Sequence, residues 1–172
     1  RSFLTYNDSK ISWKKLKRPT AEKINYNFEL EDTKKIIAAM RDYSKMIVNG
    51  EVYYQYLEIK NVFLFLLNGR RINEVLSLTF DSISNSTYTI TAERSKINRS
   101  LVFDLTSELK EVIEQQRNIS KDNKLFHFAQ NTIRRHFYSL LKALNYPRIR
   151  IHDIRHMIAS TLLQNGTAIA DI

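Results

Sequence analysis

The stretch from Glu51 to Leu67 restricts the fold more than any other part of the chain, because it is apolar almost all round at helical spacing. A helix with one apolar stripe lies on a surface, whereas a helix that is apolar on every side has to be enclosed by other elements. The stretch therefore predicts a long helix at the centre of a helical core. Its aromatic side chains are interpreted as core packing and not as a platform on which bases stack.

The flanking segments predict the helices that enclose this centre. Their apolar residues recur at helical spacing, which indicates amphipathic helices with one buried face. Turn residues separate them: Asn68-Gly69 follows the central helix, and Asn165-Gly166 would end the last one. The expected ranges are 30–43, 70–78, 106–117, 131–144 and 149–166, with Thr106 and Asn131 as N-terminal caps.

The pattern changes its period after residue 78. Short runs rich in Thr, Tyr, Ile, Val and Phe follow, a composition typical of β-strands. They are Thr79–Ile83, Thr87–Thr91 and Leu101–Leu105, and they predict a small three-stranded antiparallel sheet. The turn before the last strand carries the cations Arg94, Lys96 and Arg99. The predicted fold class is α+β, mainly α.

The composition restricts the kind of protein and of partner. The chain of 172 residues is long enough for one domain with a real core, and it holds no apolar stretch of membrane-spanning length. The absence of Cys excludes disulfides and Cys-type zinc sites. A net charge of +9 favours a polyanionic partner, nucleic acid first and an anionic membrane surface second. We expect a basic linker over residues 1–27, where Lys14–Pro19 is a basic run, and a folded domain over 28–172.

Two helix starts carry residues suited to an anion. His152 and Arg155 are three positions apart at the start of the last helix, so they project from one side of it. The first N–H groups of a helix have no intrahelical partners, and this end favours anions. Arg71 follows a glycine turn, and Glu74 could hold its guanidinium in one orientation. Taken singly, these patterns also fit solvated residues and an ordinary surface ion pair.

These patterns occur in a recognisable order. Gly-Arg-Arg-Ile-Asn-Glu at 69–74, Ser-Lys at 95–96 in a hairpin turn, and His-Asp-Ile-Arg-His at 152–156 resemble the catalytic domain of the tyrosine recombinases, the phage integrase family. The resemblance runs from about residue 30 to 172. It implies catalytic roles for Arg71, Lys96, His152 and Arg155, and supporting roles for Glu74 and His156. We assign DNA binding to Arg70, Arg94, Arg99, Arg134 and Arg135.

The resemblance also implies a reaction. Members of this family cut and rejoin double-stranded DNA through a 3′-phosphotyrosyl intermediate, with no metal or cofactor. The family pattern continues past the glycine matched by Gly166 to a His or Trp and then to the nucleophilic Tyr, whereas this sequence ends at Ile172. We therefore expect a catalytic domain that is incomplete at its C-terminus, inactive and monomeric alone, and tetrameric on DNA as a full-length protein. The expected location is the cytoplasm, at the nucleoid.

Three alternatives stay open at this stage. A type IB topoisomerase shares much of the same constellation, although the short sheet favours a recombinase. A DNA-binding module that no longer cuts fits a chain in which no Tyr follows the last predicted helix. A basic helical domain with coincidental motifs is the third. Integration, resolution and transposition are not distinguished by the sequence.

Overall fold

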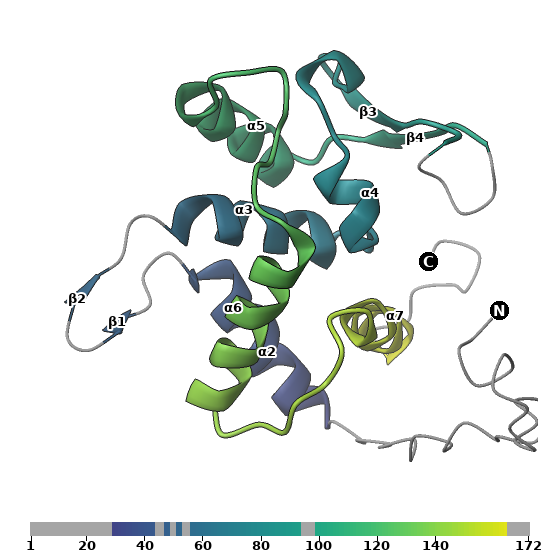
Figure 1. Ribbon diagram of the computed structural model, residues 1–172. Helices are drawn as coiled ribbons and strands as arrows, with labels where there is room; N and C mark the ends of the chain where they lie inside the picture. Colours follow the sequence, from purple (N-terminus) through teal and green to yellow (C-terminus); the bar gives the residue numbers. More distant parts are fainter. Residues whose placement is uncertain (1–28, 44–46, 49–50, 53–55, 94–98, 165–172) are drawn as a thin grey trace, which may run out of the picture.

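The computed structural model describes residues 29–43, 47–48, 51–52, 56–93 and 99–164 (Figure 1). These residues form a mainly helical domain with a small antiparallel sheet, in agreement with the predicted class. The helices are α2 (Leu30–Arg41), α3 (Leu57–Leu67), α4 (Ile72–Leu76), α5 (Ser107–Ile119), α6 (Gln130–Ala143) and α7 (Asp153–Gln164). The predicted linker over residues 1–27 lies outside the described residues.

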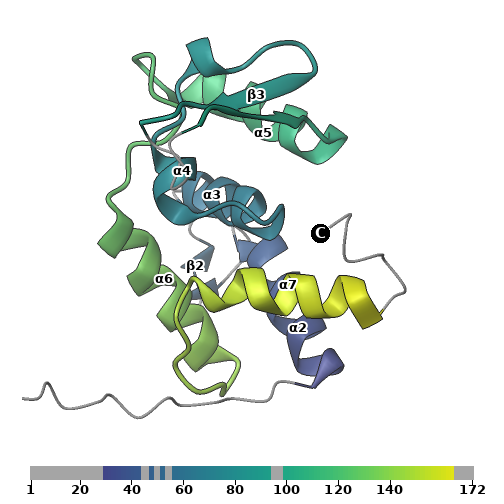
Figure 2. The same ribbon diagram turned by 90° about the vertical axis from the view of Figure 1, so that its right-hand side faces the viewer.

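Helix α3 is the centre of the core, as its sequence predicts. Nine of its eleven residues are buried, and it contacts α2, α4, α5, α6 and α7. Figure 2 shows β3 and α5 on one side of α3 and α4, with α7 and α2 on the other. The predicted start at Glu51 is wrong. Residues Ile47–Val48 (β1) and Glu51–Val52 (β2) pair instead as short antiparallel strands, with Ile47 opposite Val52.

The predicted three-stranded sheet is wrong in one strand. Thr87–Ile90 (β3) and Leu101–Asp104 (β4) pair antiparallel, with Thr87 opposite Asp104. The run Thr79–Ile83 instead contains the 3₁₀ turn η4 (Phe80–Ser82) and makes isolated bridges, from Thr79 to Lys124 and from Ile83 to Tyr88. The hydroxyl of Ser82 explains this, because it donates to the carbonyl of Thr79 at 2.6 Å and accepts from the Thr79 amide at 3.1 Å. Such local bonds compete with strand pairing.

The boundaries of α3, α5 and α6 follow the turn and cap residues in part. Gly69 has a φ of +77°, the left-handed conformation that terminates α3. Thr106 caps α5, since its hydroxyl accepts from the Leu109 amide at 3.2 Å. Asn131 is not a cap, because α6 begins one residue earlier, after Ala129. Asn145 ends α6 with a φ of +59°.

Helix α7 begins later than predicted. Residues 149–152 form the loop that leads into it, and its first helical residue is Asp153. The Asp153 carboxylate accepts from the Arg150 amide at 3.0 Å, which fixes this loop against the first turn. Ile151 and Ile154 are buried on either side of the start and anchor it to the core. Asn165-Gly166, the predicted stop, lies outside the described residues.

The apolar interior also encloses a polar pair that the sequence did not reveal. Asn61 on α3 donates to Gln116 on α5 at 3.2 Å, and Gln116 donates to the Leu125 carbonyl at 2.8 Å. Buried amides need such partners because an unmade hydrogen bond is costly away from water. The pair therefore fixes α5 and the segment that precedes α6 relative to α3. No helix within the described ranges is both long and apolar enough to cross a membrane.

Candidate active site

A pocket of about 510 Å³ lies where the starts of α4 and α7 meet α6. It brings together residues that are about 80 positions apart in the sequence. Four arginines line it, together with one histidine, two glutamates, an asparagine, a glutamine and four apolar residues. The charged and polar lining residues are Arg70, Arg71, Asn73, Glu74, Glu93, Gln130, Arg134, His152 and Arg155.

Arg71 stands at the N-terminus of α4 and is held there by Glu74. Its guanidinium donates to one carboxylate oxygen of Glu74 at 2.8 Å, and its amide donates to the other at 2.9 Å. The Glu74 side chain is 5% exposed and that of Arg71 is 35% exposed. This is a largely buried acid that fixes a partly exposed guanidinium, and not the surface ion pair that the spacing alone allowed. Removing one partner would leave a poorly solvated charge unpaired.

His152 and Arg155 reach the same pocket from the start of α7. His152 is the residue before the helix and is exposed, whereas Arg155 is half-buried in the first turn. The Arg155 amide donates to the His152 carbonyl at 3.3 Å. The structure thus brings three of the four predicted catalytic residues to one pocket: Arg71, His152 and Arg155. Lys96 lies outside the described residues.

The surroundings of His152 favour its neutral form. Partial burial lowers the pKa of its imidazole below the ordinary value of 6.5, and the nearby charges of His156 and Arg71 lower it further. The rings of His152 and His156 are 5.7 Å apart, edge to face. At neutral pH the His152 side chain is therefore an uncharged imidazole that can accept or relay a proton. His156, the predicted supporting residue, is exposed and does not line the pocket.

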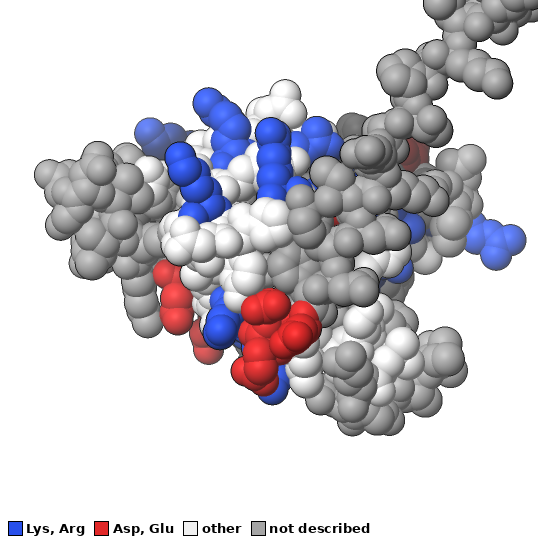
Figure 3. Space-filling model, turned by 90° about the horizontal axis from the view of Figure 1, so that it is seen from below, with Lys and Arg blue, Asp and Glu red and all other residues white. Residues whose placement is uncertain are grey.

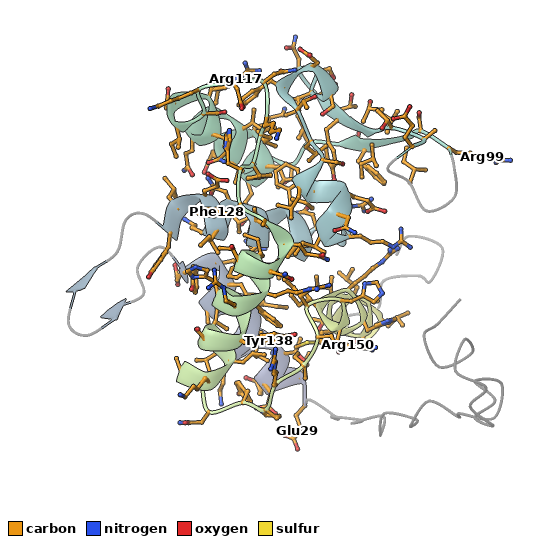
Figure 4. All side chains as sticks on the ribbon, viewed as in Figure 1. Glu29, Arg99, Arg117, Phe128, Tyr138 and Arg150 are labelled. Carbon is orange, nitrogen blue, oxygen red and sulfur yellow. The ribbon has the colours of Figure 1, made fainter. Side chains whose placement is uncertain are left out.

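The five predicted DNA-binding arginines fall in different places. Arg134 lines the pocket from α6, and Arg70 lines it with its guanidinium stacked 3.6 Å above the Phe103 ring. Arg135 is exposed on α6, and it lines a separate groove. Figure 4 shows Arg99 at the outer end of the β3–β4 hairpin, pointing away from the body of the domain. Arg94 lies outside the described residues.

That groove, which we call the α6 groove, is a basic surface that the sequence indicated only in part. It has a volume of about 880 Å³ and no carboxylate in its lining. Its cations are Arg135, Lys142 and Arg148, and Arg148 stacks 3.8 Å above the ring of Tyr138. In Figure 3 several Lys and Arg side chains stand in a row along the upper edge of the face shown, and a cluster of Asp and Glu with a few further basic side chains lies lower on the same face. Nothing in the sequence pattern distinguished Arg148 from a solvated loop residue.

Further pocket residues also escaped the sequence analysis. Gln130 and Glu93 line the pocket, although neither belongs to a recognisable motif. At the start of α7, Arg150 and Asp153 repeat the spacing of Arg71 and Glu74, with a 2.7 Å contact between guanidinium and carboxylate, but neither residue lines the pocket. Among the residues that the structure describes, no cluster of three or more His, Cys, Asp or Glu could hold a metal ion.

Fold and site together define a mainly helical domain with an arginine- and histidine-lined pocket suited to an oxyanion. The sequence pattern of the phage integrase family matches residues 27–172, and the chain belongs to this family. Its fold is similar to a crystal structure of a lambda integrase dimer bound to a COC′ core site, with a TM-score of 0.53 and 15% sequence identity. The match covers 80% of this chain and 40% of that one. No curated protein gives a significant sequence match.

Proposed function

We propose that this domain is the DNA strand-transfer domain of a site-specific recombinase. The observation that carries the proposal is the convergence of Arg71, His152 and Arg155 on one pocket from two distant helix starts. A phosphodiester is an anion that resists attack by an oxygen nucleophile. A pocket that surrounds it with fixed positive groups can bind it and stabilise the charge of the transition state.

The two arginines would act on the phosphate itself. Each planar guanidinium can donate two parallel hydrogen bonds to non-bridging oxygens of the phosphate. Glu74 keeps Arg71 in one orientation, so little of the binding energy is lost in ordering that side chain. Arg134 adds positive charge to the same wall of the pocket.

The remaining steps are proton transfers and an exchange of oxygen atoms on phosphorus. A tyrosine hydroxyl loses its proton and attacks phosphorus, a tyrosyl–phosphate bond forms, and the bond from phosphorus to the 5′-oxygen breaks. In this scheme His152 would take or relay the tyrosine proton, and Lys96 would give a proton to the leaving 5′-oxygen. Attack by the 5′-hydroxyl of another strand reverses these steps and releases the tyrosine. The chemistry uses no ATP, metal or cofactor.

The nucleophile in this proposal comes from outside the described residues. None of the described tyrosines lines the pocket, and Tyr88 is buried in the core at 2% exposure. We propose that the tyrosine is supplied by a part of the protein outside the described residues, and that four copies of the protein assemble on two DNA sites. The α6 groove would hold the backbone of the duplex beside the pocket, with a strong dependence on salt.

A covalent-adduct experiment tests the proposal. Duplexes bound by the intact natural protein are selected from a random pool, and the best site is prepared with a nick next to each candidate cleavage position. Loss of the short nicked end traps the covalent intermediate. We expect a protein–DNA band that survives denaturation and that disappears when Arg155 is changed to Gln.

The other outcomes identify the alternatives. Binding of the selected site without any adduct would replace the proposal with a non-cutting DNA-binding module. Relaxation of a supercoiled plasmid that lacks the selected site would favour a topoisomerase-like enzyme. An adduct that requires the selected site, together with joining of strands from two different duplexes, supports a recombinase.

A further inference from the structure

Arg148 differs from the other two cations of the α6 groove because an aromatic ring holds it. Its guanidinium carbon is 3.8 Å from the centroid of the Tyr138 ring on α6. Arg135 is exposed on the same helix with a 3.5 Å contact to the Thr132 hydroxyl, and Lys142 is exposed in its last turn. The ring covers only one face of the planar guanidinium, so the N–H donors at its edge stay available to an anion.

The ring that holds Arg148 is itself fixed by the core. Tyr138 is half-buried and packs against the core cluster, and its ring centroid is 6.1 Å from that of Phe137, which is fully buried. A long side chain on a surface normally loses rotamer freedom when it binds a ligand, and this loss opposes binding. Because Arg148 already lies over a fixed ring, less of that freedom remains to be lost.

The charge of Arg148 is available to a ligand, in contrast to that of Arg150. No carboxylate lines the α6 groove, and none among the described residues lies within ion-pair distance of Arg148. Asp32 accepts from the hydroxyl of the lining residue Tyr146 at 2.8 Å but does not itself line the groove. Arg150, which Figure 4 shows beside the start of α7, is bound by Asp153. Charge complementarity therefore favours an anion at Arg148.

A short, anchored segment joins Arg148 to the pocket. Ile149 and Ile151 within it are both buried, and His152, which lines the pocket, follows four positions after Arg148. Since an extended chain spans at most 3.6 Å for each residue, the Cα atoms of Arg148 and His152 are no more than about 14 Å apart. That length corresponds to about four base pairs of duplex DNA. The groove and the pocket can thus contact the same stretch of DNA.

We infer that Arg148, held in position by the Tyr138 ring, binds a backbone phosphate a few base pairs from the phosphate in the pocket and so fixes the register of the duplex. Tyr138 is then a positioning residue, and Arg148 is the phosphate-binding residue of the α6 groove. The inference rests on the proposed function for duplex DNA as the ligand. Its experiments measure binding and do not require cleavage.

The first experiment measures binding of the 172-residue chain to a fluorescein-labelled duplex of arbitrary sequence over a series of salt concentrations. Arg148→Gln should lower the affinity about tenfold and make the slope of log affinity against log salt shallower by about one, because one phosphate contact is lost. Tyr138→Leu should lower the affinity about threefold and leave the slope unchanged, because the charge remains. Tyr138→Phe keeps the ring and should retain the wild-type affinity. Thermal melts establish that each variant is folded.

A matched control removes the same charge from another cation–ring pair. Arg117 lies over the Phe80 ring at 5.0 Å and lines neither the groove nor the pocket. Arg117→Gln should change the affinity by less than about twofold. Equal losses in Arg148→Gln and Arg117→Gln would reduce the effect to net charge and overturn the inference. Wild-type affinity in folded Tyr138→Leu would exclude the positioning role of the ring.

The second experiment locates the bound phosphates on the selected duplex with the intact protein. Single phosphates are replaced in turn by uncharged methylphosphonates, and the affinity of each duplex is measured. We expect one replacement to cost about tenfold in the wild type and less than about twofold in Arg148→Gln, because the partner of that phosphate is gone. Arg155→Gln identifies the pocket phosphate in the same way, and the two positions should be a few base pairs apart.

The outcomes separate this inference from the proposed function. If no replacement loses its effect in Arg148→Gln, or if one position is coupled to both arginines, the inference is wrong even when a covalent adduct forms. If the two coupled positions are found but no adduct forms with the nicked duplex, the phosphate site is supported and strand transfer is not.

Discussion

The two helix starts that meet at the pocket use the same arrangement in different surroundings. At α4 the Glu74 carboxylate binds both the amide and the guanidinium of Arg71, and at α7 the Asp153 carboxylate does the same for Arg150. The Glu74 side chain is 5% exposed and that of Asp153 is 27% exposed, while their arginine partners, Arg71 and Arg150, are 35% and 79% exposed. Arg71 lines the pocket and Arg150 does not. The same spacing therefore gives a well-buried pair that orients an arginine at the pocket and a more exposed pair at the surface, and burial makes the difference.

The largest difference between the two helix starts is expected when Arg71 and Arg150 are changed in parallel. Arg71→Lys keeps the charge but loses the planar fork, so we expect cleavage of the selected duplex by the intact protein to fall about 1000-fold while binding stays within a few-fold. Arg150→Gln should leave the rate within about twofold. Single-turnover rates on the nicked duplex measure both. Equal losses of cleavage rate in the two variants would show that a position in the pocket does not make Arg71 more important than Arg150.

Changing the buried acid gives the next largest effect. Glu74→Gln keeps the shape of the side chain but removes the charge that faces the guanidinium. We expect cleavage to slow about 100-fold and the free energy of unfolding to fall by about 2 kcal/mol. Urea unfolding of the 172-residue chain measures the second quantity. An unchanged free energy of unfolding in this variant would contradict the expectation that the buried charge of Glu74 stabilises the fold.

The pH dependence of cleavage tests how His156 influences the pKa of His152 at the start of α7. The pKa of His152 lies below 6.5, so its neutral form is lost only as the pH falls below that value. His156→Gln removes a nearby positive charge in acid, which raises the pKa of His152. The acidic limb of the rate profile should then move to higher pH, with little change at pH 8. A limb that moves to lower pH would exclude this electrostatic influence of His156.

The smallest effect concerns Asp153. Burial raises the pKa of its carboxyl, but hydrogen bonds and the charge of Arg150 outweigh burial and leave the pKa below the ordinary value of 3.8. An acid with a depressed folded-state pKa stabilises the protein above its unfolded pKa, and this contribution is lost as the pH falls through the folded pKa. Thermal melts at pH 7 and pH 3 should therefore differ slightly less in Asp153→Asn than in the wild type. A larger difference in the variant would contradict the assigned sign.

The features that the sequence predicted well are those set by local patterns. The all-round apolar character of α3 placed it at the centre, and Gly69 and Thr106 marked helix ends through their own backbone chemistry. The third strand failed because one hydroxyl, that of Ser82, closes a turn that residue propensities do not reveal. Strands β1 and β2 have two residues each, which is too short for an alternating pattern to show in the sequence.

The sequence predicted which residues line the site, but it did not predict the contacts that hold their side chains in position. The order of motifs indicated Arg71, His152 and Arg155, and the structure places all three at one pocket, although their roles stay predictions. The burial of Glu74 depends on packing that no spacing expresses. The stack of Arg70 on Phe103 joins residues that are far apart in the chain, so no local pattern could predict it, and DNA binding by Arg70 stays a prediction.

The late position of α7 has a consequence for the protein during its synthesis. The ribosome releases Arg71 long before His152 and Arg155, and α7 has to dock on α2 and α3 before the pocket has its second wall. Because domains fold as units once enough of the chain has emerged, a nascent chain that ends before α7 lacks the side of the pocket that His152 and Arg155 supply. On the proposed function, unfinished or prematurely terminated copies would therefore be harmless to the DNA around them.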